Sequence, residues 1–554
     1  MRKYFQLSRF EWLLLAVVVL PHLLIAFSNM VAVLDWYTTD DAFYYFVPAR
    51  NIAAGNGISF DGLTRSNGFH PLWMAVLVPI FALAQIDNIL PLRMLIVVLA
   101  LLNAATGIVL FRLVKRYLSI EVAAFVAFVW ALTPAIHGLT TKGGVEAGLN
   151  AFFILLLWER VSAFNQREQL EGHYWREIAG LGLIAAFTIF TRLDNIFLVF
   201  FAGLWLWLRW FGDNWGQRLR MGFAFFLPVV VIMLGYLVWN QVAFGTPTPV
   251  SGQIKLWWGT LDGTVYGFPV KRLETFAGQF FTDDEDLGPW HVATAGLYRT
   301  AENIVANQGG EVTVAARRNV LLALGGGIGL LAAAVTWLQC KFVWRAVVGM
   351  GFFSFFLATF AQITYYKAAG SMAQQPWYWV SETVFLVLVL GLLLEALRRT
   401  VDRYIPIPRA FTCRAFNLFS ILLVLGFFGY MLAGLRPNAN PDSHYYVHRP
   451  VWMEANTEPG ARIAVTGAGN LGYFTEGRTI VNMDGLMNSY DYFLALQNGT
   501  GAEFLADLGV DYVFGNNYVV AVSNPYGPML EGHLREAGVY RFGERELILW
   551  KFVP

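Results

Sequence analysis

Charged residues are scarce in this chain of 554 residues. Only 14% of the residues are charged, whereas 57% are hydrophobic; soluble domains carry about 25% charged residues. The formal net charge of +1 leaves no basic excess to neutralise phosphates, which argues against a nucleic-acid partner. The composition therefore predicts a polytopic α-helical membrane protein that is embedded in the lipid bilayer.

Cysteine is almost absent as well. Cys340 and Cys413 each lie beside Lys or Arg at the end of an apolar run. These positions predict a cytoplasmic location and no disulfide.

Near the N-terminus, Arg2, Lys3 and Arg9 precede an apolar run that lacks a small-residue cleavage site, so this run is predicted to be an uncleaved first span.

Apolar runs and basic loops together predict a topology. The positive-inside rule places the basic loops, at 112–116, 160–176, 218–220, 341–345 and 398–414, in the cytoplasm. This arrangement predicts about eleven crossings of the plasma (inner) membrane, with a cytoplasmic N-terminus and an extracytoplasmic C-terminal segment. The expected spans are 11–28, 91–111, 121–138, 147–161, 178–193, 195–211, 221–243, 319–339, 346–363, 380–397 and 415–433.

A further apolar run lies at 70–86. Because the loop that begins at 29 is expected outside and the basic loop 112–116 inside, an odd number of crossings must lie between residues 70 and 112, yet there are two apolar runs. As a helix the run at 70–86 reaches only about 25 Å, against a hydrocarbon core of about 30 Å. It is therefore predicted to be an interfacial or re-entrant helix in the first external loop, 29–90. A second large external loop is expected at 244–318, and both belong to a membrane domain at 1–433.

Residues 434–554 have a different pattern. Short apolar runs at 462–466, 511–514 and 546–551 predict strands, with helical stretches between them, and so indicate an extracytoplasmic α/β domain. A Gly-x-Gly-x-x-Gly string at 467–472 lacks the rest of a dinucleotide-binding unit. It is interpreted as a tight strand-to-helix turn.

Asp40 and Asp41 lie side by side among aromatic residues, immediately outside the first span. A carboxylate pair at a membrane interface costs solvation free energy, so it usually has a partner or a chemical role. Burial and a like-charged neighbour raise a carboxyl pKa toward the range of a general base. The alternative is a solvated loop that happens to contain two acids.

The residues that follow carry a resemblance to a known family. After the Asp pair come the turn Gly55-Asn56-Gly57 and the sequence Ser66-Asn67-Gly68-Phe69-His70-Pro71. This order resembles the first external loop of GT-C glycosyltransferases. It is most similar to the branches that use polyprenyl-phosphate donors: the protein O-mannosyltransferases, aminoarabinose transferases and arabinofuranosyltransferases.

Further segments resemble the same family. Residues 141–149, with Glu146, resemble its second external loop, and 191–195 resemble its Arg-Pro-Asp/Glu turn with Leu193 in place of proline. Asn240, the stretch 244–249 and Lys255 resemble an Asn…Phe-Gly-x-Pro-x-Pro…Lys pattern. In the C-terminal segment, 469–474 and 481–486 resemble recurring parts of the external domains of such proteins.

The resemblance implies an inverting transferase that moves a hexose or pentose from a polyprenyl-phosphate-linked sugar donor to an extracytoplasmic glycan, lipid or protein acceptor. The general base would be Asp41 or Asp40, with a slight preference for Asp41. Tyr44 would contribute to binding the donor phosphate or the substrate. No cofactor is implied, and no metal site is indicated. The acidic run 283–286 lacks EF-hand spacing and is interpreted as a solvated loop.

Cations on the external loops are candidates for binding the donor phosphate. Arg192 and Lys255 are the first of these, with Asp194 beside Arg192 in the same turn. Lys142 is alternatively a solvated charge, and Lys367 an interfacial anchor.

Other candidates also have two interpretations. His70 either faces the donor phosphate or caps the interfacial helix, and Glu146 either contacts the acceptor or pairs with Lys142. The aromatic stretch 374–379 is either a sugar platform or part of an interfacial belt.

Two other function classes remain open at this point. A transporter or flippase for lipid-linked sugars would more often place charges within broken helices and show internal repeats. A non-catalytic scaffold for lipid-linked glycans would not need the Asp pair. The concentration of charges in loops on one predicted face favours the enzyme.

Overall fold

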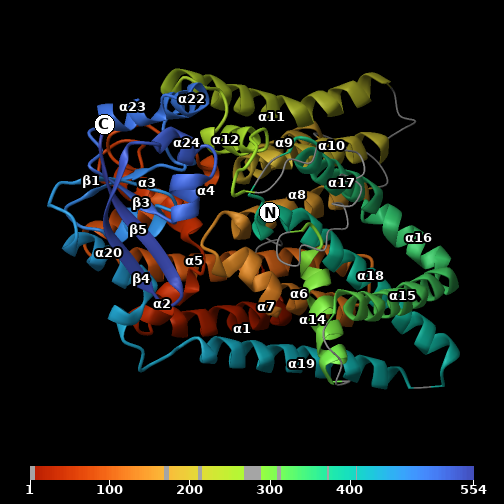
Figure 1. Ribbon diagram of the computed structural model, residues 1–554. Coiled ribbons are helices and arrows are strands. Elements are labelled where there is room, and N and C mark those ends of the chain that lie inside the picture. The colour runs from red at the N-terminus through yellow and green to blue at the C-terminus, as the bar shows by residue number, and fades with distance from the viewer. Residues whose placement is uncertain are drawn as a thin grey trace.

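The computed structural model describes residues 6–167, 174–209, 215–266, 288–307, 313–370, 373–406 and 408–554. The acidic run 283–286 lies outside these residues. Most of the described chain is helical, and a single five-stranded sheet lies near its C-terminal end. Figure 1 shows the sheet at one end of the helix bundle, beside the short helices of the first predicted external loop.

The membrane domain is built from helices that follow the predicted apolar runs in order. The long ones are α1 (Arg9–Ala26), α5 (Leu90–Val114), α6 (Ile120–Leu132), α8 (Ala147–Asn165), α9 (Tyr174–Thr191), α10 (Ile196–Arg209), α11 (Trp215–Phe244), α15 (Val314–Leu338), α17 (Phe352–Ala368), α18 (Val380–Tyr404) and α19 (Arg409–Ala433). The shorter ones are α2 (Met30–Trp36), α3 (Phe43–Ala53), α4 (Pro71–Phe81), α7 (Pro134–His137), α12 (Val250–Trp258), α14 (His291–Asn307) and α16 (Cys340–Gly349).

Seven of the described helices are long and apolar enough to cross a membrane. Two bent pairs raise that number to nine: α6 with 134–142, bent by 52°, and α16 with α17, bent by 64°. The first bend falls at Pro134, where the ring prevents a continuous helix. The chain is therefore an integral membrane protein. The prediction of eleven crossings would also need α9 and α10, which do not pass this test of length and hydropathy.

The run at 70–86 forms α4, followed by a short 3-10 helix at Ala82–Gln85. Pro71 occupies the first helical turn, where its missing N–H costs nothing. The apolar stretch is shorter than the spanning helices, in agreement with an interfacial or re-entrant helix.

The C-terminal segment begins with α20 (Tyr445–Ala455) and carries strands β1 (Arg462–Val465), β2 (Thr479–Asn482), β3 (Tyr512–Gly515), β4 (Leu534–Phe542) and β5 (Arg545–Phe552). Their order in the sheet is β2-β1-β3-β5-β4. β1 pairs in parallel with β2 and β3, whereas β5 pairs antiparallel with β3 and β4. The predicted strands are confirmed, and β2 and β4 are additional.

Four helices accompany the strands of this segment: α21 (Gly469–Phe474), α22 (Tyr490–Asn498), α23 (Gly501–Asp507) and α24 (Tyr526–Leu530). The glycine string 467–472 is a strand-to-helix turn from β1 into α21, as predicted, and Gly467 has a φ of +68°.

The first predicted external loop packs directly on this segment. α21 contacts α3, and Phe43 lies against the ring of Tyr473. At Gly68 the approach is so close that a Cβ would lie 2.0 Å from the backbone oxygen of Leu486. The chain is therefore folded back on itself, so that residues more than 400 positions apart share one surface.

The predicted topology leads to a labelling test. In a Cys413→Ser background, a membrane-impermeant maleimide should label exposed Cys340 only in inside-out vesicles. With both cysteines replaced by serine and exposed Asn498 changed to cysteine, labelling should occur only in right-side-out vesicles. Labelling of Cys340 and the cysteine at 498 from the same side would contradict the topology.

Candidate functional site

A cavity of about 520 Å³ lies where the predicted external loops meet the C-terminal segment. It is lined by residues from six separate parts of the chain, within 41–70, 145–146, 192–197, 248–256, 365–378 and 486–487. Seven of the site residues expected from the sequence line it: Asp41, Tyr44, His70, Glu146, Arg192, Asp194 and Lys255. Asp40, Lys142 and Lys367 do not line it.

Asp41 lies in a short 3-10 turn, Asp40–Ala42, that leads into α3. Its carboxylate lines the cavity and has no hydrogen-bond partner among the described residues. Burial is the main reason that its pKa is raised from 3.8 to about 6, with Lys255 opposing the shift and Asp40 and Asp484 adding to it. Asp41 is thus a carboxylate that exchanges its proton near neutral pH.

Asp40 has a different environment. Its two carboxylate oxygens accept hydrogen bonds from the backbone N–H groups of Gly469 (2.7 Å) and Asn470 (2.8 Å), and Arg449 lies 3.6 Å away. Burial raises the pKa of Asp40, against the effect of these partners. A Cβ at Gly469 would lie 2.3 Å from the backbone oxygen of Asp40, so only glycine allows this approach. Asp40 therefore connects the first loop to the C-terminal segment.

Tyr44 makes a second connection one helical turn later. Its hydroxyl donates to Asp484 (2.5 Å) and accepts from the N–H of Ala468 (3.2 Å). The other oxygen of Asp484 accepts from the N–H of Leu486 (3.0 Å). Since Asp484 is buried, its pKa is raised above the ordinary value. The C-terminal segment thereby supplies the wall of the cavity next to Asp41.

Arg192 lies at the centre of a buried ion-pair network. It follows α9 and donates to Glu146, the residue before α8, and through two nitrogens to Asp194 at 3.1 and 3.2 Å. The hydroxyl of Tyr366, on α17, donates to Asp194 at 2.7 Å. Two carboxylates thus balance one guanidinium, and a network satisfied in this way fixes the geometry of a site.

Glu146 has two further neighbours. The hydroxyl of Tyr45 donates to it (2.8 Å), and Nε2 of His70 lies 3.6 Å from it. Burial raises the pKa of Glu146, but His70, Arg192 and Tyr45 together outweigh burial, so the pKa lies below its ordinary value. The suggested pairing with Lys142 is absent: Glu146 pairs with Arg192.

His70 precedes α4 and lines the cavity without making a side-chain cap to the helix. Burial lowers its pKa, so the ring is neutral at pH 7. Its buried Nδ1 has no hydrogen-bond partner among the described residues. His70 therefore occupies the N-cap position of α4, as one interpretation expected, but its side chain faces the cavity and does not cap the helix.

Lys255, on α12, is the cation of the cavity without a carboxylate within ion-pair distance among the described residues. Its ammonium donates to the hydroxyl of Tyr378 (2.6 Å) and to the backbone oxygen of Ala373 (3.2 Å), which are both neutral. Burial lowers the pKa of Lys255, but Tyr378 and Asp41 raise it above the ordinary value. Lys255 is therefore charged and able to meet an anion.

Two buried asparagines hold α12 in place. The amide of Asn67 donates to Asn240 at the end of α11 (2.9 Å), and its oxygen accepts from the N–H of Val250 at the start of α12 (3.0 Å). The pattern Asn…Phe-Gly-x-Pro-x-Pro…Lys is thus a turn between two helices. It fixes where Lys255 enters the cavity.

Aromatic and apolar side chains complete the lining. Trp377 and Tyr378, from the predicted aromatic stretch, line the cavity, and Tyr378 lies 4.4 Å from the guanidinium carbon of Arg192. Ile196 and Tyr365, on α10 and α17, extend the cavity to an exposed apolar surface of the helix bundle. The cavity therefore has a polar end, lined by the charged side chains, and an apolar exit at the surface of the helix bundle.

The two remaining lysines lie elsewhere. Lys367 donates to Gln374 (3.1 Å), with its ammonium 5.9 Å from the ring centre of Trp379. Lys142 lies in the segment before Glu146 and is half-buried near Asp35. Among the described residues, no group of three His, Cys, Asp or Glu side chains is arranged to hold a metal ion.

Sequence reasoning missed several residues of the site. Tyr45 and Tyr366 bond to the ion-pair network, and Asp484 orients Tyr44. The adjacent tyrosines at 44 and 45 could have indicated these contacts, because neighbouring residues on a helix point in different directions and so reach different partners, here Asp484 and Glu146. For Asp484 the sequence held no signal beyond the resemblance of its segment to external domains, because its hydrogen bond to Tyr44 joins residues 440 positions apart.

Comparisons with known proteins bear on the fold. Residues 439–545 match the model of a family described as Domain of unknown function (DUF8728). No curated protein sequence matches the chain. Among solved structures, the oligosaccharyltransferase AglB from Archaeoglobus fulgidus, in complex with an inhibitory peptide and a dolichol-phosphate, is similar at a TM-score of 0.53 and 13% identity, covering 97% of this chain and 74% of that chain.

A second solved structure is similar over nearly the whole of both chains. ArnT from Cupriavidus metallidurans, bound to undecaprenyl phosphate, has a TM-score of 0.52 and 12% identity and covers 98% of this chain and 97% of that chain. A further structure of the Archaeoglobus fulgidus enzyme, tethered with an acceptor peptide, gives a TM-score of 0.55 at 13% identity, with 100% and 75% covered. The chain has the GT-C fold.

The environment of Asp40 leads to a stability prediction. Asp40→Ala leaves two backbone N–H groups without an acceptor, at a cost of about 1–3 kcal/mol. We therefore expect a lower Tm in a thermal unfolding assay. Asp442→Ala, which changes an exposed aspartate in the same segment, should leave the Tm unchanged. Equal Tm values for Asp40→Ala and wild type would show that this contact does not stabilise the fold.

Proposed function

We propose that the protein is an inverting glycosyltransferase that moves one hexose or pentose from a polyprenyl-phosphate donor to a hydroxyl of an extracytoplasmic acceptor. The acceptor would be a cell-envelope glycan, a lipid or a protein. One observation carries the proposal: a single cavity holds both a carboxylate and a cation beside an apolar exit to the membrane. Among the described residues, the carboxylate of Asp41 has no hydrogen-bond partner, and Lys255 has no carboxylate within ion-pair distance.

Asp41 acts as the general base in this proposal. As the acceptor oxygen attacks the anomeric carbon, its proton passes to the Asp41 carboxylate, and the bond from that carbon to the phosphate oxygen breaks. The electron pair of the broken bond leaves with the polyprenyl phosphate. A single displacement of this kind inverts the anomeric configuration. A pKa of about 6 suits the task, because the group is mostly ionised at neutral pH and still accepts a proton.

Lys255 is proposed to bind the phosphate that leaves. In the part of the chain that the structure describes, the partners of its ammonium are neutral, so its charge is available to the phosphate group. Arg192 lines the same cavity, but Glu146 and Asp194 already balance its charge. We therefore assign Arg192 to positioning and to secondary contact with the donor. The neutral ring of His70 is proposed to donate a hydrogen bond to a phosphate oxygen.

The apolar exit supports a lipid-linked donor. Ile196 and Tyr365 line the cavity and are 53% and 43% exposed on the surface of the helix bundle. Two solved structures of the same fold contain dolichol-phosphate and undecaprenyl phosphate. A prenyl chain that lies along α10 and α17 would place its phosphate within reach of Lys255.

A transporter or a scaffold for lipid-linked sugars is the alternative function. Each would use the apolar exit and Lys255, but neither needs an unpartnered carboxylate with a raised pKa. The Asp41 environment therefore favours the enzyme. A transfer assay in nanodiscs, with a panel of labelled polyprenyl-phosphate sugars, separates these functions. Binding of a donor without transfer to any acceptor in a membrane extract would favour the alternative.

The role of Asp41 predicts a specific pH dependence. A base works only when deprotonated, so kcat/KM should rise with pH through about 6 and then level off. Asp41→Asn should lose transfer by at least about 100-fold while binding donor normally. Because the folded pKa is raised from 3.8, the charged form disfavours the fold above pH 6. The Tm of Asp41→Asn at pH 7.5 should therefore not fall below that of wild type.

Lys255 offers a second test with a matched control. Lys255→Met keeps an unbranched side chain, one atom shorter, but removes the charge that would meet the phosphate. We expect about tenfold or greater weakening of donor binding, the size of a charge-assisted hydrogen bond. Lys142→Met changes a lysine outside the cavity and should leave donor binding unchanged. Equal weakening by the two substitutions would argue against a specific phosphate contact.

A further inference from the structure

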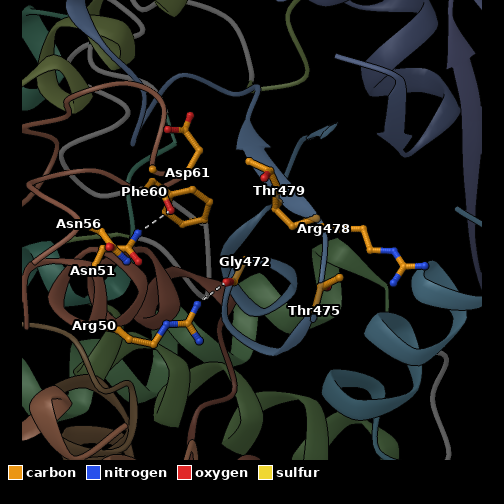
Figure 2. Close-up of a pocket in the computed structure, with 11 residues that line it drawn as sticks. Arg50, Asn51, Asn56, Phe60, Asp61, Gly472, Thr475, Arg478 and Thr479 are labelled. Atoms are coloured by element: carbon orange, nitrogen blue, oxygen red, sulfur yellow. Dashed lines mark hydrogen bonds between the residues drawn. The ribbon is translucent and has the colours of Figure 1, made fainter. Parts of the chain in front are cut away.

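A second cavity, of about 340 Å³, lies between the first external loop and the C-terminal segment. Figure 2 shows Arg50, Asn51, Asn56 and Phe60 on the side of the first loop, with Thr479 on the other side. The volume is within the range of about 300–1,000 Å³ that is typical of small-molecule sites. None of the candidate site residues discussed above lines it.

The charged side chains of this cavity already have partners within the protein. Arg50 donates to the backbone oxygens of Tyr473 (2.7 Å) and Gly472 (2.9 Å), the contact drawn in Figure 2. Arg478 runs away from the first loop and donates to backbone oxygens of 454 and 457. The carboxylate of Asp61 accepts hydrogen bonds within its own turn. These contacts join the two walls and shape the cavity.

The groups left for a ligand are neutral. The side-chain amide of Asn56, the amide oxygen of Asn51 and the hydroxyl of Thr479 line the cavity and have no side-chain hydrogen-bond partner among the described residues. The hydroxyl of Thr475 is buried and likewise has no partner among them. Such a group costs free energy unless something satisfies it, which marks a place where a ligand gains hydrogen bonds.

The cavity also adjoins the proposed catalytic one. Phe60 lines the second cavity, and its ring packs edge-on against Tyr44, with 6.0 Å between the ring centres and 77° between the planes. Tyr44 lines the catalytic cavity. One aromatic pair thus stands between the two spaces.

We propose that the second cavity binds a neutral sugar residue of a carbohydrate acceptor, set back from the hydroxyl that reacts at Asp41. Neutral amides and hydroxyls can both donate to and accept from the hydroxyl groups of a sugar. The guanidinium donors of Arg50 and Arg478 are already directed at backbone oxygens, so the hydrogen-bonding capacity left in the cavity belongs to neutral groups. This inference rests on the proposed function and assigns a glycan as the acceptor.

The test is direct binding of the full-length protein in nanodiscs to a printed panel of neutral and acidic oligosaccharides. Wild type should bind at least one neutral glycan. The double variant Asn56→Ala, Thr479→Val should bind it about tenfold more weakly, as expected for two lost hydrogen bonds. Asn498→Ala, at an exposed site in the same segment, should bind like wild type.

A second variant separates binding from folding. Thr475→Val replaces the unpartnered hydroxyl by a methyl group of the same shape, so the Tm should stay equal or rise while glycan binding weakens. Asp41→Asn should keep full glycan binding even though transfer is lost, which distinguishes failure of this inference from failure of the proposed function. The inference is overturned if wild type binds no glycan, binds only acidic ones, or loses nothing in the cavity variants.

Discussion

The site depends on one contact: the Asp40 carboxylate on the backbone N–H groups of Gly469 and Asn470. It joins the turn that follows α2 to the turn that follows β1, more than 400 positions later in the chain. Because Asp41 is the next residue, the same contact leaves its carboxylate facing the cavity. The two adjacent acids thus have different environments: Asp40 bonds to the C-terminal segment, and Asp41 has no hydrogen-bond partner among the described residues.

Charge balance explains the rest of the cavity. Glu146 and Asp194 enclose Arg192, so that a buried guanidinium, costly alone, becomes a rigid support with its hydrogen bonds satisfied. Lys255 remains as the cation of the cavity whose partners within the described ranges are neutral. Asp41 and Lys255 are therefore the groups whose charges a substrate would complete. This division between support and chemistry follows from contacts rather than from residue type.

Sequence alone predicted much of this arrangement and missed the rest for a physical reason. Hydropathy located the helices, and local motifs placed Asp41, His70 and Lys255 near one another. The roles of Asp40 and Arg192 depended on partners distant in sequence: the backbone turn at 469–470 for Asp40, and Glu146, the residue before α8, for Arg192. β2 and β4 were missed because β2 is only four residues long and only one residue of β4 is buried, so neither contains a long apolar run.

The central claim is that Asp41, and not Asp40, takes the acceptor proton. Chemical rescue tests it most directly, because Asp41→Ala leaves a space in the cavity that a small carboxylate such as formate can enter. With a donor that the wild type uses, added formate should restore part of the transfer in Asp41→Ala and none in Asp40→Ala. Rescue of Asp40→Ala alone, or full transfer by Asp41→Ala without formate, would contradict the account.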